Sequence, residues 1–313
     1  MPGTAPSSAP KVGVVGCGRW GRHVVRDLAA LGCDVTVAAR SAASAARARS
    51  AGASATVPAL AALPEVEGIV VTTPTRTHAE ITAEALARGV PVYVEKPLAD
   101  DAAAAAQLAA AAPDRLFVMD KWRYHPGVRE LARIAAGQEL GRVAALHLRR
   151  ISCGHGYADV DPVWILLPHD LSIALEILGE VPAARWAVEE RVGGQRVGLT
   201  AGLGDALPVS AEVSAAGDGH HREVRLVCED GWAVLPGGYA EALAVLRGPL
   251  AEPAVEHRPI AGELPLLAEL RAFVEHLRGG PPPRSSASEG AAIVQRIEEL
   301  GALARPPADT EAA

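Results

Sequence analysis

Lys96 follows an apolar, β-rich run, Val90–Val94, in the segment Glu95-Lys96-Pro97. The chain has three lysines and many arginines, so a structural cation at this place could have been an arginine. Arginine does not release its proton in proteins, whereas a partly desolvated lysine has a lowered pKa and can give up or take up a proton. Lys96 is therefore a candidate acid/base group, and a surface lysine with its amine in water is the alternative.

Three glycines have the GxGxxG spacing, in the segment GCGRWG at 16–21 between a predicted strand and a predicted helix. In such a turn the first glycine permits the sharp bend, the second lets a pyrophosphate approach the backbone, and the third lets helix and strand pack closely. The helix N-terminus adds free N–H groups for phosphate. We predict a dinucleotide site here, a merely structural turn being the alternative; its residues are Gly16, Cys17, Gly18, Arg19, Trp20 and Gly21.

The second predicted strand ends in Ala39-Arg40-Ser41. A site for NAD has an Asp or Glu at this place, which accepts a hydrogen bond from the ribose 2′-OH. Arginine and serine suit a 2′-phosphate instead. We therefore predict that Arg40 and Ser41 favour NADP(H) over NAD(H); the alternative is that Arg40 is one of many surface arginines.

The elements that must position these residues alternate between strands and helices up to Asp120. This alternation predicts βαβ units and a parallel sheet, and we assign residues 11–120 to a Rossmann dinucleotide-binding domain. The predicted strands are 11–15, 34–39, 68–73, 90–95 and 115–120, and the predicted helices are 22–31, 41–51, 78–89 and 100–112.

After Asp120 the pattern changes to one long alternating strand, several alternating segments with glycine-rich turns, and four helices. We expect an α/β protein whose second domain, 121–306, is α+β with a large, mostly antiparallel open sheet. The predicted strands are 142–151 and the segments within 184–246, and the predicted helices are 125–137, 163–178, 264–278 and 287–304. Packing of the last helix back onto the Rossmann domain remains an alternative, and residues 1–10 and 307–313 are predicted flexible tails.

Length and composition limit the classes of function. A chain of 313 residues suits two domains, and a net charge of −7 with a pI near 5.8 disfavours nucleic acid or an anionic membrane as the main partner. The four cysteines are scattered without CxxC spacing, and the N-terminus lacks the pattern of a signal peptide, so we expect a cytoplasmic protein. His155, His220 and His221 have no second ligand cluster, so we predict no metal site.

Three parts of the chain together resemble one family: GCGRWG, the segment VVTTPTRTHAEITAEALARGVPVYVEKPLA at 70–99, and the sheet-forming C-terminal half. The family is that of glucose–fructose oxidoreductase and inositol dehydrogenase, written Gfo/Idh/MocA, and the resemblance covers roughly residues 11–305. It implies a Rossmann domain followed by an α+β domain whose open sheet often mediates oligomerisation. A homo-oligomer, dimer or tetramer, is the corresponding expectation.

The resemblance also assigns residues to the cofactor. It implies that Lys96 lies beside the nicotinamide and the reacting carbon, that Glu95 lines the nicotinamide site, and that the following proline is often cis. The TPxxxH segment follows a strand at the carboxyl edge of the sheet, where open α/β sheets bind ligands. Its cofactor-binding candidates are Thr73, Pro74, Thr75 and His78.

Residues 164–180 resemble the second signature of the family, a helix with an Asp four residues before a His. His169 stands at the histidine position, but Ile165 replaces the Asp. His169 acts with Lys96 alone, or with help from Asp161 or Asp170, or it is a binding or structural histidine. Because alcohol oxidation needs a base and carbonyl reduction needs an acid, the missing carboxylate favours reduction.

The segment DKWRYHPGV at 120–128 resembles the start of the second domain in this family. The substrate candidates are Lys121, Arg123, Tyr124, Asp161 and Trp164. We expect an NADP(H)-dependent reductase of a ketone, such as a free or nucleotide-linked keto-sugar in a biosynthetic pathway. The alternatives are reduction of a non-sugar ketone or imine, and a non-catalytic NADP-binding sensor, against which the retention of both Lys96 and His169 argues.

Overall fold

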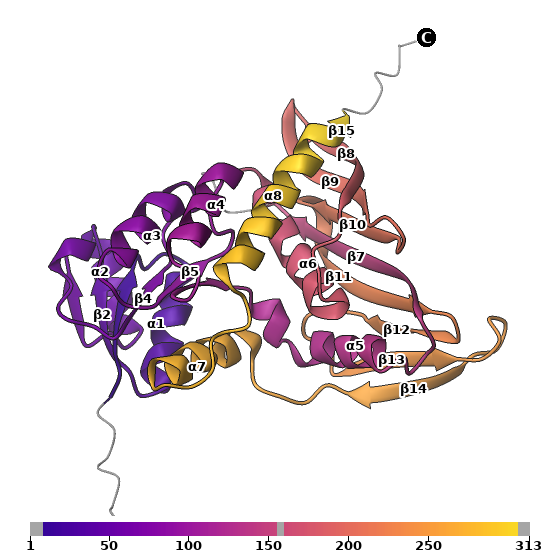
Figure 1. Ribbon diagram of the computed structural model, residues 1–313, viewed down its shortest axis with the longest axis horizontal. Coiled ribbons are helices and arrows are strands. Elements are labelled where there is room, and N and C mark those ends of the chain that lie inside the picture. Colours follow the sequence, from indigo (N-terminus) through magenta and orange to yellow (C-terminus); the bar gives the residue numbers. More distant parts are fainter. Residues whose placement is uncertain (1–8, 155–159, 306–313) are drawn as a thin grey trace, which may run out of the picture. The chain divides into compact units, whose positions relative to one another are not determined.

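A six-stranded parallel sheet with the strand order β3-β2-β1-β4-β5-β6 forms the first part of the computed structural model, which describes residues 9–154 and 160–305 (Figure 1). This order is that of a doubly wound dinucleotide-binding sheet, and the predicted Rossmann fold is confirmed. The strands are β1 (Lys11–Val15), β2 (Asp34–Ala38), β3 (Ala55–Val57), β4 (Gly68–Val71), β5 (Val92–Glu95) and β6 (Leu116–Met119). The helices are α1 (Gly21–Ala30), α2 (Ala42–Ser50), α3 (His78–Leu86) and α4 (Ala102–Ala111), with short 3₁₀ helices η1 (Leu60–Ala62) and η2 (Thr75–Thr77).

The buried strands of this sheet consist largely of β-branched residues, which suit a sheet covered on both faces. β3 was not predicted, because its three residues lie in an alanine-rich stretch too short to show alternation. The predicted tails are described only at Ala9 and Pro10; Pro10 is buried and its carbonyl accepts a hydrogen bond from Asp34 N at 2.9 Å, while 307–313 lie outside the described residues.

The chain divides into two units, residues 1–121 with 266–291 and residues 122–265 with 292–313. Helix α7 (Pro265–Leu277) therefore belongs mainly to the first unit, although the sequence analysis placed it within 121–306. The reason is its apolar face: Leu270 and Phe273 are fully buried in the cluster that contains Val12 and Val70 of the parallel sheet. Helix α8 (Ala287–Leu303) begins in the first unit and continues in the second.

The second unit contains a nine-stranded sheet with the order β14-β13-β12-β11-β7-β10-β9-β8-β15. Most neighbours are antiparallel, as predicted, but β10 pairs with β7 and β15 with β8 in parallel. The strands are β7 (Val143–Cys153), β8 (Ala184–Val192), β9 (Gln195–Leu203), β10 (Val209–Ser214), β11 (Ala216–Cys228), β12 (Gly231–Leu235), β13 (Ala242–Arg247), β14 (Ala254–Pro259) and β15 (Ala304–Arg305).

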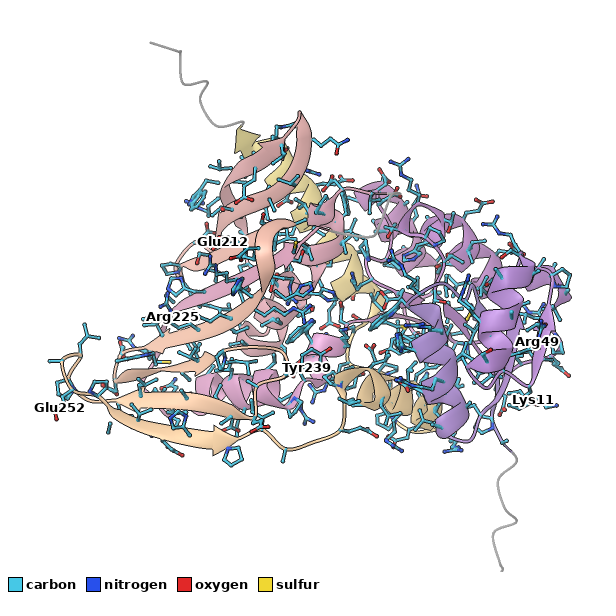
Figure 2. The ribbon with its side chains drawn as sticks, turned by 180° about the vertical axis from the view of Figure 1, so that it is seen from behind. Lys11, Arg49, Glu212, Arg225, Tyr239 and Glu252 are labelled. Atoms are coloured by element: carbon cyan, nitrogen blue, oxygen red, sulfur yellow. The ribbon has the colours of Figure 1, made fainter. Side chains whose placement is uncertain are left out.

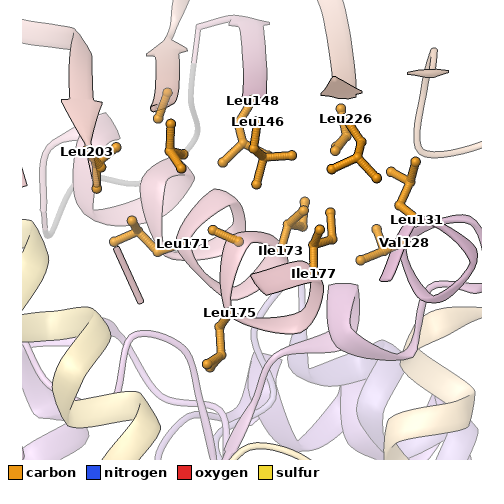
Figure 3. Close-up of a cluster of buried hydrophobic side chains, with 14 of the residues drawn as sticks. Val128, Leu131, Leu146, Leu148, Leu171, Ile173, Leu175, Ile177, Leu203 and Leu226 are labelled. Atoms are coloured by element: carbon orange, nitrogen blue, oxygen red, sulfur yellow. The ribbon is translucent and has the colours of Figure 1, made fainter. Parts of the chain in front are cut away.

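Helices α5 (Pro126–Ala136) and α6 (Pro162–Leu178), with the short 3₁₀ helix η3 (Lys121–Tyr124) before them, carry the remaining candidate residues. Figure 3 shows side chains of β7, such as Leu146 and Leu148, facing Ile173 and Ile177 of α6. These four side chains are buried in one cluster, so a Leu→Ala change there is expected to cost about 2–5 kcal/mol. This cluster fixes α6 against the sheet.

In the part of the chain that the structure describes, no helix has the length and apolarity needed to cross a membrane.

Candidate active site

The glycine turn joins β1 to α1, and each of its glycines has a separate steric reason. Gly16 has φ +89°, and a Cβ there would lie 3.1 Å from the carbonyl oxygen of Thr72. A Cβ on Gly21 would lie 2.6 Å from Thr72 Oγ1, whereas one on Gly18 would meet nothing within 4 Å. Gly18 thus leaves open space over the turn, and Gly21 lets helix α1 approach the end of β4, as the motif requires.

Two residues of α2 hold this turn, and the sequence analysis did not identify either. The Cys17 carbonyl oxygen accepts hydrogen bonds from Ser44 Oγ at 3.2 Å and Arg47 Nε at 2.9 Å. The Cys17 side chain is buried, and burial raises the pKa of its thiol while the Arg47 charge opposes the shift. Cys17 is therefore suited to packing rather than to nucleophilic chemistry. The sequence could have indicated these two residues, because a Ser and an Arg three residues apart lie on one face of a helix.

Arg40 and Ser41 follow β2, where no acidic residue stands. Ser41 Oγ accepts a hydrogen bond from Ser44 N at 3.1 Å and caps the N-terminus of α2. Arg40 is exposed. The helix cap thus accounts for Ser41 structurally, and Arg40 is the residue of the pair whose charge faces solvent.

His78 links two loops at the carboxyl edge of the parallel sheet. It is buried, and its ring nitrogens Nε2 and Nδ1 lie 2.9 Å from the carbonyl oxygen of Thr73 and 2.7 Å from that of Pro97. Pro74 is exposed at the start of η2 and Thr75 is buried. His78 therefore holds the TPxxxH loop to the segment that contains Lys96, and a cofactor role for it would be indirect.

Lys96 lies directly after β5, and the Lys96–Pro97 peptide bond is cis. Burial raises the pKa of the neighbouring Glu95 carboxyl, and the charges of Lys96 and Lys121 oppose that shift. Lys121 Nζ lies 4.2 Å from the centre of the Trp20 ring, in a cation–π contact. Residues of the glycine turn and of the ends of β5 and β6 are thus gathered at one edge of the sheet.

Glu269 of α7 is a further member of this group that the sequence analysis missed. It is 0% exposed, and burial together with the charge of Glu95 raises the pKa of its carboxyl well above the ordinary value. The Lys121 charge acts in the opposite direction. The sequence could have indicated Glu269, because it is a glutamate between Leu266 and Phe273 on the apolar face of a helix, where charged residues are rare.

In the second unit, His169 lies on α6 one turn after Ile165, which is buried. Both carboxylates proposed as substitutes have structural partners. Asp161 caps α6 by accepting from Val163 N at 2.9 Å and pairs with Arg196. Asp170 accepts from Arg150 Nε and Nη2 at 2.9 and 3.0 Å in a buried bidentate pair. Neither carboxylate is therefore placed as a ready replacement for the acid at Ile165.

Trp122 is the centre of an aromatic and cationic group in this unit. Its ring stacks on His125 at 5.0 Å between centroids and meets His169 edge-on at 6.5 Å. The Arg150 guanidinium lies 4.7 Å from the Trp122 ring centre. The group places a cation and a titratable imidazole around one indole.

The other substrate candidates differ in their surroundings. Arg123 is buried, and its Nε donates to Glu176 Oε2 at 3.0 Å, so it anchors η3 to α6. Tyr124 and Trp164 are half-buried. Among the described residues no group of three or more His, Cys, Asp or Glu could hold a metal ion, and His155 lies outside them.

Comparison with known proteins agrees with this geometry. Residues 10–118 match the family model described as oxidoreductase family, NAD-binding Rossmann fold. The inositol 2-dehydrogenase of Ralstonia nicotianae is 28% identical, in an alignment that covers 94% of this chain and 96% of that protein. The glycine turn, the sheet order and these matches define an NAD(P)-binding oxidoreductase. Over residues 10–118 the chain is similar to the Gfo/Idh/MocA family of oxidoreductases.

Two solved structures share the whole fold. The UDP-N-acetylglucosamine 3-dehydrogenase of Acidithiobacillus ferrooxidans has a TM-score of 0.81 at 23% identity, covering 95% of this chain and 98% of that one. A 3-ketoreductase from Actinomadura kijaniata, in complex with TDP-benzene and NADP, has a TM-score of 0.82 at 21% identity, covering 95% and 98%. At these identities the likeness establishes the fold of both units.

Proposed function

We propose that the protein is an NADP(H)-dependent reductase that transfers hydride to a ketone, with Lys96 and His169 as its acid/base groups. Lys96 carries this proposal: it is a lysine at the end of β5, next to the desolvated Glu95 carboxyl, in the unit that carries the glycine turn. An ammonium group there donates to the ketone oxygen as negative charge develops on it during hydride transfer.

The preference for NADP(H) rests on the end of β2. Arg40 is exposed there and no carboxylate is present to accept from a ribose 2′-OH. NADP supplies the hydride when it is bound in its reduced form, and the chain's part is to bind and orient it. Titration of the intrinsic fluorescence with NADPH and NADH tests the preference, which equal affinities or tighter NADH would overturn.

The direction of the reaction and the class of substrate rest on other observations. Reduction is favoured because Ile165 replaces a carboxylate beside His169, and both Asp161 and Asp170 have structural partners. The sugar and polyol compounds named for the relatives motivate a keto-sugar, free or nucleotide-linked, as the substrate. The second unit would bind it and, in an oligomer, would supply the interface through its open sheet.

Lys96→Ala tests catalysis against a sensor function. In an enzyme, removal of the acid should lower kcat by about 10²–10⁴-fold on a ketone that wild type reduces, while the NADPH dissociation constant changes little. Lys11→Ala is the matched control, because that lysine lies at the opposite end of the sheet, at the start of β1. A panel of keto-sugars and other ketones, followed by loss of NADPH absorbance, identifies the substrate; a wild type that binds NADPH and reduces no member of the panel would contradict the reductase.

A further inference from the structure

A small recess in the second unit lies beside strands β7 and β11 and the segment after β12. Its lining includes Trp122, Arg150, Asp170, Arg222 and Gly238. The recess is partly open to solvent, and its inner space of about 10 Å³ takes about one water-sized group, such as a single oxygen atom of a ligand. All of these residues belong to one unit, so the recess is formed within it.

The recess carries more positive than negative charge. Arg150 and Arg222 are direct partners across β7 and β11, so their side chains lie on the same face of the sheet. Asp170 is the carboxylate on that face, and both of its oxygens accept from Arg150. The next pair along, Arg149 and Glu223, also contributes to the lining of the recess, and Arg149 is paired with Glu212 at 2.9 Å. Two guanidinium groups therefore share one carboxylate.

Among the described residues, Arg222 has no hydrogen bond to a carboxylate, because both oxygens of Asp170 accept from Arg150. The Arg222 Nε–H group is buried and has no hydrogen-bond acceptor among the residues that the structure describes. Burial and the Arg150 charge lower the pKa of Arg222, and Tyr239 and Asp170 oppose that shift; the guanidinium remains protonated at neutral pH. Tyr239, labelled in Figure 2, is highly exposed and does not remove the charge.

Gly238 lies close to both Trp122 and Arg222 in the lining of the recess. A Cβ on Gly238 would lie 2.7 Å from Trp122 Cη2 and 3.5 Å from Arg222 Nη1, so a larger residue at 238 would collide with the indole. The Gly238 carbonyl accepts from His125 Nε2 at 3.1 Å, and His125 stacks on Trp122. Trp122 Nε1 is a second buried donor without an acceptor in the described parts of the chain.

We propose that this recess binds a carboxylate group of the substrate, with Arg222 as its main partner. A planar carboxylate matches the fork of N–H groups on a guanidinium, and its oxygens can accept from Arg222 at the mouth of the recess, in addition to the hydrogen bond between Arg222 and Tyr239. A phosphate, which is tetrahedral and bulkier, fits the small space less well. Because His169 lies 6.5 Å from Trp122, the carboxylate would stand near the group that we propose for proton transfer. This inference rests on the proposed function as a ketone reductase. It names the substrate as a ketone that carries an acid group, such as a keto-uronate.

Direct binding tests this proposal without turnover. Calorimetric titration of the NADPH-loaded protein, at fixed ionic strength, uses glucuronate, glucose and glucose 6-phosphate as probes. We expect glucuronate to bind at least about tenfold more tightly than glucose, the size of one charge-assisted hydrogen-bonded contact. Equal binding of glucuronate and glucose, tighter binding of glucose 6-phosphate, or no binding of any probe would each overturn it.

In Arg222→Met, glucuronate should bind no more tightly than glucose, whereas in Arg225→Met it should still bind more tightly. Arg225 is the matched control because it lies on the same strand, is exposed and is not part of the recess lining (Figure 2). Arg222→Lys keeps the charge but loses the fork, so its advantage should be intermediate, and it remains informative if the methionine variant does not fold. An Arg222→Lys protein that binds glucuronate as wild type does would contradict the paired contact.

The same preparations separate this inference from the proposed function. Ketone reduction and NADPH binding are measured beside the titrations. Binding of glucuronate that depends on Arg222, in a protein that reduces no ketone, would refute the reductase and support the carboxylate site. Ketone reduction with equal binding of glucuronate and glucose would support the reductase and refute the site.

Discussion

The two units concentrate charge in opposite ways. In the first unit, three buried or partly buried carboxyl groups, Glu95, Asp120 and Glu269, form a group in which Lys121 lies near Glu95 and Glu269, and Lys96 near Glu95. In the second, two arginines, Arg150 and Arg222, face the single carboxylate of Asp170. The first group holds lysines, whose protons can be exchanged, and the second holds guanidinium groups, which keep theirs.

This difference separates two tasks. A lysine ammonium can give up its proton, so the first group can take part in proton transfer. An excess of arginine beside an indole suits the binding of an anion and offers no proton. We therefore infer that Lys96 contributes to proton transfer, as we propose also for His169, and that the arginines of the second unit contribute to recognition.

The largest expected effect is on stability, at the buried pair of the second unit. Asp170→Asn keeps the volume of the side chain but leaves Arg150 and Arg222 without a counterion. Breaking a buried ion pair in this way should lower the free energy of unfolding by about 3–5 kcal/mol, which urea denaturation followed by circular dichroism measures. Asp205→Asn is the control, because its pair with Arg185 is exposed and should contribute less than about 1 kcal/mol. If both variants lost similar amounts of unfolding free energy, the difference between the buried and the exposed ion pair would be refuted.

Gly21→Ala should have the next largest effect, in the first unit. Its Cβ would lie 2.6 Å from Thr72 Oγ1, which donates to the Gly16 carbonyl at 2.9 Å, so the turn must shift. We expect NADPH to bind about 10–100-fold more weakly and the protein to lose about 1–3 kcal/mol of stability.

Gly18→Ala gives the matched comparison, because a Cβ there has no neighbour within 4 Å. This variant should keep the stability of wild type and weaken only NADPH binding, since its methyl group would occupy the space expected for the pyrophosphate. Loss of stability in Gly18→Ala, or unchanged binding in both variants, would contradict the role assigned to this turn.

Glu269 makes the stability of the first unit depend on pH. Its folded-state pKa is raised above the unfolded value, so it contributes fully below the unfolded pKa, and that contribution is lost as pH rises through the folded pKa. Glu269→Gln, which is neutral at every pH, should therefore be more stable than wild type by about 1–2 kcal/mol at pH 8 and similar to it at pH 4. Urea denaturation at the two pH values measures this, with the exposed Glu275→Gln on the same helix as a control that should change neither value. A Glu269→Gln protein that is less stable at pH 8 would show that the carboxylate is ionised in the folded state.

The sequence predicted the fold of the first unit well, and its candidate residues stand in short motifs at the ends of strands. GCGRWG and the Glu95-Lys96-Pro97 segment could be placed from local spacing alone, and the Rossmann sheet order confirms the fold around them. Glu269 was missed because α7 joins that unit from more than a hundred residues away. A single domain boundary between residues 120 and 121 cannot assign a later segment, such as α7, to the first unit.

The second unit could be predicted only as a class of fold. Its recess combines Trp122, Arg150, Asp170 and Arg222, which come from η3, β7, α6 and β11 and are brought together by the register of β11 on β7. No spacing in the sequence gives that register. Arg123 was considered for substrate binding, although its pair with Glu176 anchors a helix, because charge alone does not distinguish these two uses.

The smallest expected effect concerns the contact of Ser44 with the glycine turn. Ser44→Ala removes one of two hydrogen bonds to the Cys17 carbonyl, and the oxygen still accepts from Arg47 Nε at 2.9 Å. Because no buried acceptor is left unsatisfied, the cost should be about 0.5–1.5 kcal/mol, and NADPH should bind less than about tenfold more weakly. Ser50→Ala, at the exposed end of α2, should change neither the melting temperature nor the affinity.

The Arg47→Met variant should lose more stability than Ser44→Ala. The double variant should lose more than the sum of both single losses, because only then is the Cys17 carbonyl left without a donor from α2. Additive losses would mean that the two donors hold the turn independently of each other.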